Sequence, residues 1–186
     1  MKIRLAALLA CMALSAPLAA QQFDTISFGV DGGYPPFDVL EPRGEITGFD
    51  IDIANALCTQ LKAKCVFVKQ PFESMIAALN AHKFDAIIAS LNITDERKKE
   101  VDFTDRYYRS AAQLVARKGS PLLPDVASLK GKTVGVQTGS THEAFAKANW
   151  ANHGVKIVGY ANQDNVYLDL LLSLIHISEP TRHSLI

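Results

Sequence analysis

Short apolar runs alternate with stretches of helical spacing through the first half of the chain. The apolar runs predict strands at residues 25–30, 65–68 and 85–89. The spacing of apolar side chains between and after these runs predicts helices over 50–61 and 72–82. The intervening segment 31–48 is rich in glycine and proline and is predicted to be a loop. Strands that alternate with helices predict parallel pairing in a layered α/β fold.

A second α/β unit is predicted to begin near residue 111. Its strands are expected at 113–116, 133–136 and 155–160, and its helices at 141–151 and 164–171. We therefore expect two α/β lobes that are joined near residues 105–115, with a cleft between them.

The first 20 residues differ from the rest of the chain. Lys2 and Arg4 are followed by an apolar run and then by small residues that end at Ala20. This layout is typical of a secretory signal peptide that is cleaved after Ala20, and it predicts export. A buried N-terminal helix and lipid attachment at Cys11 are the less favoured alternatives.

Composition limits the classes of function. Of the 186 residues, 48% are hydrophobic and 20% are charged, which is typical of a globular rather than a disordered protein. The formal net charge of +0 provides no basic field for nucleic acid. After residue 20, no apolar run approaches the length of a membrane span.

Two cysteines, Cys58 and Cys65, would remain after removal of a signal peptide. An oxidising compartment and an even cysteine count favour a disulfide between them. A zinc site is not expected, because no partner histidine or cysteine lies at ligand spacing. We predict neither a metal nor a cofactor.

The first candidate binding feature lies just past the predicted strand 85–89. A polar turn that contains Ser90 and Asn92 follows the strand, and Arg97 stands one turn further on. Hydroxyl, amide and guanidinium groups at the carboxyl end of a buried strand suit a small carboxylate ligand. The alternative is that residues 95–100 form only a solvated helical face.

The second candidate is the turn 138–141, which precedes a predicted helix. Exposed N–H groups and the positive end of the helix dipole make such a turn an anion site. The turn could close on a carboxylate held by Arg97. Ordinary helix capping by Ser140 or Thr141 is the equally weighted alternative.

The third candidate is a set of acidic and aromatic residues around the predicted loop. Asp31 ends the first strand, Tyr34 follows in the loop and Asp50 opens the helix. Tyr34 could lie against a cationic side chain, and the two carboxylates could neutralise it. The alternatives are that Asp31 serves the turn and that Asp50 caps the helix.

Signals for catalysis are weak. Residues 131–133 resemble the end of a phosphate-binding loop, but the first glycine is missing and the segment precedes a strand. His142 has no evident nucleophile beside it in the sequence. We therefore do not expect an enzyme.

Residues 24–171 resemble the polar amino-acid-binding proteins of bacterial ABC importers, in particular the lysine/arginine/ornithine and histidine group. The agreeing segments are DGGYPPF at 31–37, GFDIDIANALC at 48–58, FDAIIASLNITDERKKEVDFT at 84–104, LKGKTVGVQTGSTHE at 129–143 and YANQDNVYLDL at 160–170. The resemblance implies a two-lobed periplasmic-binding-protein type II fold that closes like a hinge around one amino acid. It also implies a periplasmic monomer that delivers its ligand to an inner-membrane ABC permease.

The resemblance also implies roles for individual residues. Arg97 and the Thr141 backbone would hold the ligand α-carboxylate, with help from the backbone at Asn92. Ser90 would help to orient the α-ammonium, and Tyr34 and Phe72 would stack on the ligand side chain. Asp31 and Asp50 would face its distal cationic group, and Ser140 and His142 would line the second lobe.

Three positions depart from the cationic-binding members of the group. Ala89 and Asn92 stand where those members carry serines, and Gln137 replaces an apolar residue. The sequence therefore does not decide among arginine, lysine, ornithine and histidine as the ligand, and glutamine is also a candidate. The alternative function is a periplasmic cyclohexadienyl dehydratase on the same scaffold, which would use groups such as His142 and Asp50.

The end of the chain departs from the family pattern after Leu171. Residues 172–186 resemble an in-frame translation of a transposon-derived sequencing adapter, and we expect them to be non-native. The alternative is a divergent natural tail. The expected organisation is a first lobe at 21–110 and a partial second lobe at 111–171, so that the fold is incomplete in this chain.

Overall fold

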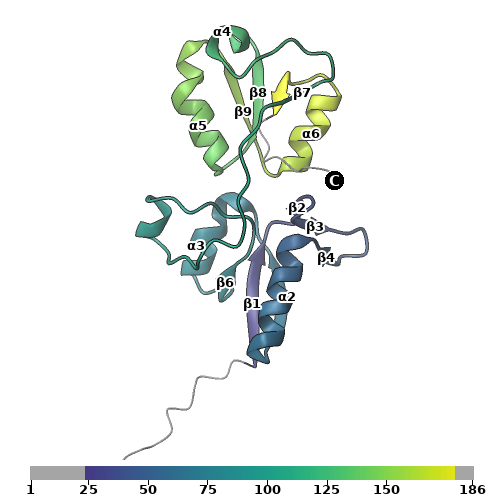
Figure 1. The fold of residues 1–186 in the computed structure, drawn as a ribbon, viewed down its shortest axis with the longest axis vertical. Helices are drawn as coiled ribbons and strands as arrows, with labels where there is room; N and C mark the ends of the chain where they lie inside the picture. The colour runs from purple at the N-terminus through teal and green to yellow at the C-terminus, as the bar shows by residue number, and fades with distance from the viewer. Residues whose placement is uncertain (1–23, 179–186) are drawn as a thin grey trace, which may run out of the picture.

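The computed structural model describes residues 24–178 of the chain. The predicted signal peptide and Cys11 lie outside these residues. Figure 1 shows two α/β lobes, one formed by the elements up to β6 and the other by β7 and the elements that follow it. The expectation of two α/β lobes is therefore confirmed.

The first lobe is built on a parallel sheet with the strand order β5-β1-β6. The strands of this sheet are β1 (Thr25–Val30), β5 (Lys64–Lys69) and β6 (Ala86–Ile87). The helices of the lobe are α2 (Phe49–Leu61), the 3₁₀ turn η2 (Phe72–Ser74) and α3 (Met75–Asn80). The helix predicted over 72–82 is thus shorter, and its first turn is a 3₁₀ turn.

Alternating side chains of β1 give the first lobe two apolar layers. Phe28 and Val30 pack with Ile51 and other residues of α2. Gly29 faces the opposite way, where the ring of Phe84 lies so close that a Cβ on Gly29 would be 2.4 Å from it. Because side chains on a strand alternate between faces, β1 supports both layers. Glycine at this position leaves room for the aromatic ring.

The segment 31–48 contains a small antiparallel sheet, so its prediction as a loop was wrong. Its strands are β2 (Gly33–Tyr34), β3 (Asp38–Leu40) and β4 (Ile46–Thr47). The ladders are two residues long on each side of β3. Such short pairings leave no alternating apolar pattern in the sequence, which explains why they were missed.

An irregular segment leads from β6 to the second lobe (Figure 1). It contains one 3₁₀ turn, η3 (Arg97–Lys99). The second lobe has the strand order β7-β10-β8-β9. Its elements are β7 (Val115–Ala116), α4 (Val126–Leu129), β8 (Thr133–Gln137), α5 (Thr141–Asn149), η4 (Ala151–His153), β9 (Lys156–Tyr160), α6 (Gln163–Leu171) and β10 (Ile177–Ser178).

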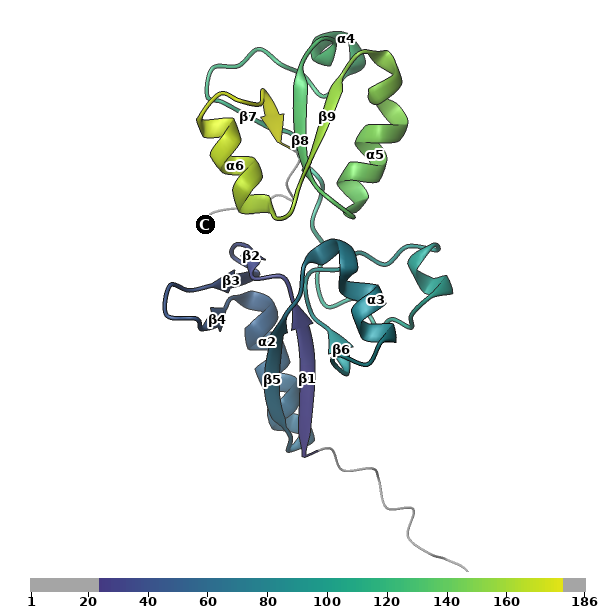
Figure 2. The same cartoon turned by 180° about the vertical axis from the view of Figure 1, so that it is seen from behind.

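Helices α5 and α6 cover opposite faces of this second sheet (Figure 2). Val134 and Val136 of β8 pack with Ala146 and Trp150 on the α5 side. The intervening residue, Gly135, faces the α6 side, where its position is in close contact with Val166. The alternation of β8 therefore builds this lobe in the same way as β1 builds the first.

The segment predicted to be a non-native tail contributes to the second lobe. Strand β10 lies between β7 and β8, antiparallel to the former and parallel to the latter. Ile175 is 3% exposed, and Ile177 and Ser178 are fully buried. The foreign origin of residues 172–186 stays a prediction, but their first part packs as core.

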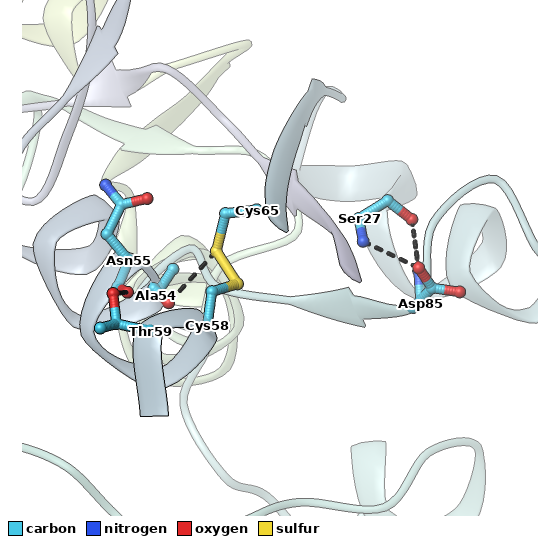
Figure 3. The surroundings of a disulfide bond; sticks show 7 residues. All are labelled: Ser27, Ala54, Asn55, Cys58, Thr59, Cys65 and Asp85. Atoms are coloured by element: carbon cyan, nitrogen blue, oxygen red, sulfur yellow. Dashed lines mark hydrogen bonds between the residues drawn. A yellow bond between two sulfur atoms is a disulfide. The ribbon is translucent and has the colours of Figure 1, made fainter. Parts of the chain in front are cut away.

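The predicted disulfide between Cys58 and Cys65 is confirmed (Figure 3). It joins the last turn of α2 to the edge strand β5, with a Cα–Cα distance of 5.8 Å. On the other edge of the same sheet, the Asp85 carboxylate accepts a hydrogen bond of 2.8 Å from the backbone N–H of Ser27. No helix within residues 24–178 is long and apolar enough to cross a membrane.

Candidate ligand-binding site

A cavity of about 460 Å³ lies where the two lobes and the connecting segment meet. It is lined by nine of the ten predicted ligand-binding residues, which are Asp31, Tyr34, Phe72, Ser90, Asn92, Arg97, Ser140, Thr141 and His142. These residues come from both lobes. The structure therefore brings together the three groups that the sequence suggested separately.

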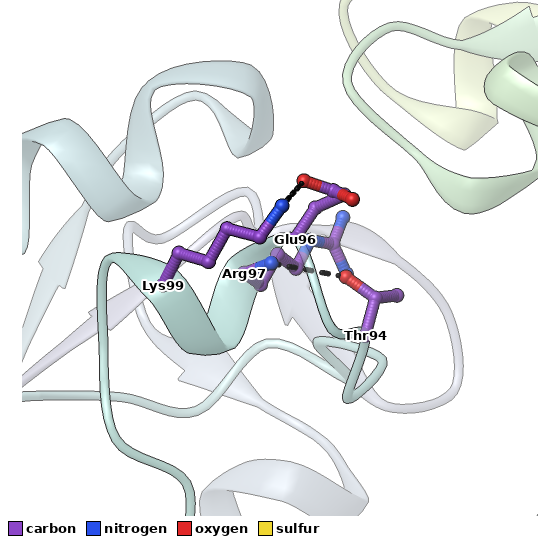
Figure 4. Close-up of polar contacts among 4 residues, drawn as sticks. All are labelled: Thr94, Glu96, Arg97 and Lys99. Carbon is purple, nitrogen blue, oxygen red and sulfur yellow. Dashed lines mark hydrogen bonds and ion pairs between the residues drawn. The ribbon is translucent and has the colours of Figure 1, made fainter.

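Arg97 occupies the start of η3, and the loop before it fixes its backbone. Its N–H donates to Oγ1 of Thr94 over 3.2 Å (Figure 4). Its guanidinium donates from Nη1 to the carbonyl of Asn92 at 2.8 Å and from Nη2 to the carbonyl of Gly139 in the second lobe at 3.0 Å. Both partners are neutral carbonyl groups.

The charge of Arg97 is uncompensated within residues 24–178, where no carboxylate lies within ion-pair distance of its guanidinium. Burial lowers the pKa of Arg97 from its ordinary value, yet a guanidinium keeps its charge in proteins. The side chain also lies over the ring of Phe72, with Cζ 5.7 Å from the ring centroid. A half-buried cation in a cavity, held only by dipoles and a ring face, suits an anionic ligand.

The solvated-face alternative describes the neighbours of Arg97 but not Arg97 itself. Lys99 pairs with Glu96 at 2.6 Å, and both side chains are exposed (Figure 4). Lys98 lies 3.8 Å from Asp95, also in solvent. Arg97 has carbonyl partners at the cavity instead.

The turn before α5 is both a helix cap and a potential anion site. Oγ of Ser140 accepts from the backbone N–H of Glu143 at 3.1 Å, and Oε2 of Glu143 accepts from the N–H of Gly139 at 2.8 Å. The first contact is the N-cap of α5, and the second resembles half of a capping box in which Glu143 reaches the residue before the N-cap. Within residues 24–178, no acceptor takes the backbone N–H of Thr141 or of His142. Those two N–H groups, at the positive end of the helix dipole, suit a carboxylate.

Asp31 directly follows β1, and the residue is 5% exposed. Nε2 of Gln137, from the second lobe, donates to Oδ2 of Asp31 over 2.9 Å. Burial raises the pKa of Asp31 above its ordinary value, and the hydrogen bond from Gln137 opposes that rise. Gln137 lines the cavity, but the sequence pointed to it only as a departure from the family pattern.

The structure does not place Asp50 at the cavity. Asp50 is fully buried behind it, and its carboxylate accepts hydrogen bonds from Oγ of Ser90 at 2.9 Å and from the hydroxyl of Tyr107 at 3.0 Å. The N-terminus of α2 also has no side-chain cap, so the capping alternative for Asp50 does not apply. Ser90 adopts a φ of 51°, which costs backbone energy in a non-glycine residue. The buried carboxylate holds it in that conformation.

Two aromatic residues of the connecting segment also line the cavity and were missed. They are Tyr107 and Tyr108. The ring of Tyr108 stacks on Phe37 at 4.8 Å, and Phe37 stacks on Tyr34 at 5.5 Å. The connecting segment has neither helical nor strand periodicity, so its sequence gave no sign that these rings face the site.

His142 lines the cavity at the start of α5. Burial lowers its pKa from the ordinary value, so the neutral imidazole is favoured near pH 7. A neutral imidazole adds no second cation beside Arg97. Within residues 24–178, no group of three or more histidine, cysteine, aspartate or glutamate side chains is arranged to hold a metal ion.

The two lobes touch each other directly at several points. Asn92 of the first lobe donates from Nδ2 to Oγ1 of Thr141 over 2.9 Å. A Cβ on Gly139 would lie 2.8 Å from Cα of Glu73, and a Cβ on Gly33 would lie 2.7 Å from Cβ of Asn162. The lobes are therefore in a closed arrangement, and two glycines allow their backbones to approach.

Known proteins are similar to this chain in sequence and in fold. Residues 26–171 match the model of the bacterial extracellular solute-binding proteins, family 3. The lysine/arginine/ornithine-binding periplasmic protein of Escherichia coli K12 is 48% identical over 147 residues, which cover 79% of this chain and 56% of that protein. The histidine-binding periplasmic protein of Salmonella typhimurium is 47% identical over 145 residues, which cover 78% of this chain and 56% of that protein.

A solved structure agrees. An ancestral arginine-binding protein bound to arginine superposes with a TM-score of 0.82 at 35% identity, covering 87% of this chain and 71% of that one. This chain spans just over half the length of the curated relatives above. Those relatives are binding proteins, which supports the prediction that the chain is not an enzyme. On the family match, the chain belongs to the bacterial extracellular solute-binding proteins of family 3.

Proposed function

We propose that the protein is the periplasmic binding component of an ABC importer and that it captures a cationic L-amino acid between its lobes. Relatives that bind lysine, arginine, ornithine or histidine support this ligand class. The uncompensated charge of Arg97 in the cavity carries the proposal, because a half-buried guanidinium with only carbonyl partners suits the carboxylate of an amino acid.

The ligand α-carboxylate binds between the two lobes. Arg97 offers guanidinium N–H donors from the first lobe, and the N-terminus of α5 offers the backbone N–H groups of Thr141 and His142 from the second. Charge-assisted hydrogen bonds of this kind are short and strong. In the closed protein, the carbonyl of Gly139 accepts a hydrogen bond from Arg97, and the hydroxyl of Thr141 accepts one from Asn92. The ligand carboxylate would replace some of these acceptors.

The ligand side chain extends from that anchor toward Asp31. Tyr34 and Phe72 line the cavity on the way, and their rings suit an aliphatic stem that ends in a cation. The buried carboxylate of Asp31 then neutralises the distal charge. Asp50 is assigned a supporting role, because its contacts are with Ser90 and Tyr107 rather than with the cavity.

Calorimetric titration of the purified protein with arginine, lysine, ornithine, histidine and glutamine tests the proposal. We expect saturable binding of at least one cationic amino acid, and a loss of about 100-fold or more in affinity for Arg97→Ala. Arg43, which is exposed on the loop before β4, provides a matched control as Arg43→Ala. Unchanged affinity in the Arg97 variant, or no binding by the wild-type protein, would overturn the proposal.

The same samples decide between binding and catalysis. Incubation with prephenate or arogenate, followed by chromatography, detects dehydratase product. We expect none from a protein that binds amino acids. Product formation that depends on His142 would instead favour the enzyme.

A further inference from the structure

Gln137 reaches from the end of β8 across the cavity to the first lobe. Its side chain is buried, with 6% exposed. Nε2 donates to Oδ2 of Asp31 at 2.9 Å, and Nε2 also lies 3.5 Å from the carbonyl of Ala161. Because both neighbours can only accept, the amide nitrogen must face them and the orientation of the amide is fixed.

That orientation leaves the amide oxygen for a ligand. Among residues 24–178, no group donates a hydrogen bond to Oε1 of Gln137. Gln137 and Asp31 both line the cavity. A neutral carbonyl acceptor thus stands beside a buried carboxylate, and the hydrogen bond from Nε2 couples the two groups.

We infer that Gln137 is a specificity-determining residue: its Oε1 and the Asp31 carboxylate form a two-acceptor subsite that favours a guanidinium over an ammonium group. The inference rests on the proposed function. It assigns the choice among cationic amino acids to a residue of the second lobe.

The reason lies in the shapes of the two cations. A guanidinium carries several N–H donors in a rigid planar fork, so it needs acceptors on more than one side. An ammonium is a compact point charge whose donors rotate toward a single carboxylate. An apolar residue at position 137 would leave a guanidinium N–H without an acceptor inside the closed cavity, and a buried unpaired donor is costly. The charge of Asp31 would remain for either cation.

Titration of the wild-type protein and Gln137→Leu with arginine and with lysine tests the inference. We expect arginine to bind the variant about ten-fold or more weakly, while lysine changes by less than about three-fold. The ratio of the two affinities therefore falls. Gln60→Leu makes the same chemical change on the exposed side of α2 and should leave both affinities unaltered.

The other outcomes are informative. Equal weakening of both ligands would show that Gln137 only joins the lobes. If neither affinity changes, Gln137 does not contribute to binding. Either result would overturn the inference while leaving the proposed function intact. A wild-type protein that binds no cationic amino acid would overturn both. If Gln137→Leu fails to fold, as judged by thermal unfolding, Gln137→Asn keeps the polar group one carbon shorter. It should show the same fall in the ratio.

Discussion

Nδ2 of Asn92 donates a hydrogen bond to Oγ1 of Thr141 over 2.9 Å, although these residues belong to different lobes. The backbones of both residues were predicted to hold the ligand carboxylate. In the structure the side chains of these two residues bind each other, and this contact between the lobes favours the closed arrangement. The balance between open and closed lobes then depends on single side chains.

Thr141→Val should shift that balance toward the open arrangement. The substitution keeps the shape of the side chain but removes the acceptor for Asn92. We expect the ratio of closed to open protein without ligand to fall by about two- to ten-fold, which corresponds to the loss of one ordinary hydrogen bond. Fluorescence energy transfer between labels at the exposed positions Leu61 and Asn152 measures the change. An unaltered distribution would mean that the bond does not contribute to closure.

Tyr107→Phe should destabilise the protein by about 1–3 kcal/mol, because it leaves an oxygen of the fully buried Asp50 without its donor. Urea unfolding measures the loss. Tyr160→Phe provides a matched control. The hydroxyl of Tyr160 donates to Asp169, which is only partly buried, so that water can replace the lost donor. Equal losses in the two variants would contradict a special role for the buried carboxylate.

Gly33→Ala should weaken ligand binding without unfolding either lobe. The added Cβ would meet Cβ of Asn162 at 2.7 Å and prevent full closure. Overpacking of this kind costs about 1–3 kcal/mol, or roughly five- to 150-fold in affinity. Isothermal titration measures the loss. Adding Asn162→Gly should restore affinity, because glycine removes the clash and is a tolerated helix cap; failure of this rescue would contradict the steric explanation.

Stability should fall as the pH rises from about 4 to about 7. Asp38 is fully buried, its Oδ1 has no hydrogen-bond partner among the described residues, and burial raises its pKa from 3.8 to about 7. The folded protein therefore holds this proton more tightly than the unfolded chain does. Burial also raises the pKa of Asp31 and Asp50, which adds to the same trend.

Asp38→Asn should reduce this pH dependence, because an amide does not titrate. Thermal unfolding at about pH 5 and about pH 8 compares the two proteins, and each kcal/mol corresponds to about 2–4 °C in Tm for a chain of this size. We expect a higher Tm at the lower pH in the wild type and a smaller difference in the variant. Equal differences would show that Asp38 does not titrate in this range.

Reduction of the disulfide should destabilise the first lobe by about 2–3 kcal/mol, the value expected for a short closed loop. Cys58 and Cys65 are seven positions apart and tie α2 to β5. Thermal unfolding with and without a reductant measures the effect, and a Cys58→Ser/Cys65→Ser double variant removes any effect of the reductant itself. If Tm is the same in all cases, the bond does not stabilise the fold.

The main strands and helices could be predicted because their apolar periodicity reflects their burial. In β8, Val134 and Val136 are fully buried and alternate with Gly135, and the pattern is visible in the sequence. The two-residue strands around β3 carry no such pattern. Their pairing depends on backbone geometry and on neighbours that are distant in the sequence.

The sequence predicted most of the residues that line the candidate site, but it did not show which of the predicted residues are buried behind others. Arg97 and Asp31 were found because their chemistry follows a strand end. Asp50 carries the same chemistry, but Tyr107, 57 positions away, covers one of its oxygens. Gln137 looked only like a departure from a pattern until its contact with Asp31 showed a partner 106 positions away. Spacing along a chain does not reveal which polar group lies in front of another.

Direct bonding between the lobes would have a consequence for energy use in the transport proposed above. Asn92, Arg97 and Asp31 each have a partner in the opposite lobe, so contacts between protein groups favour the closed shape. If the protein serves a permease as proposed, and that permease senses lobe orientation, contacts that favour the closed shape before cargo binds would stimulate ATP hydrolysis without transport. Idle hydrolysis would then rise with the strength of these contacts, and selection on them would act through the energy spent for each amino acid imported.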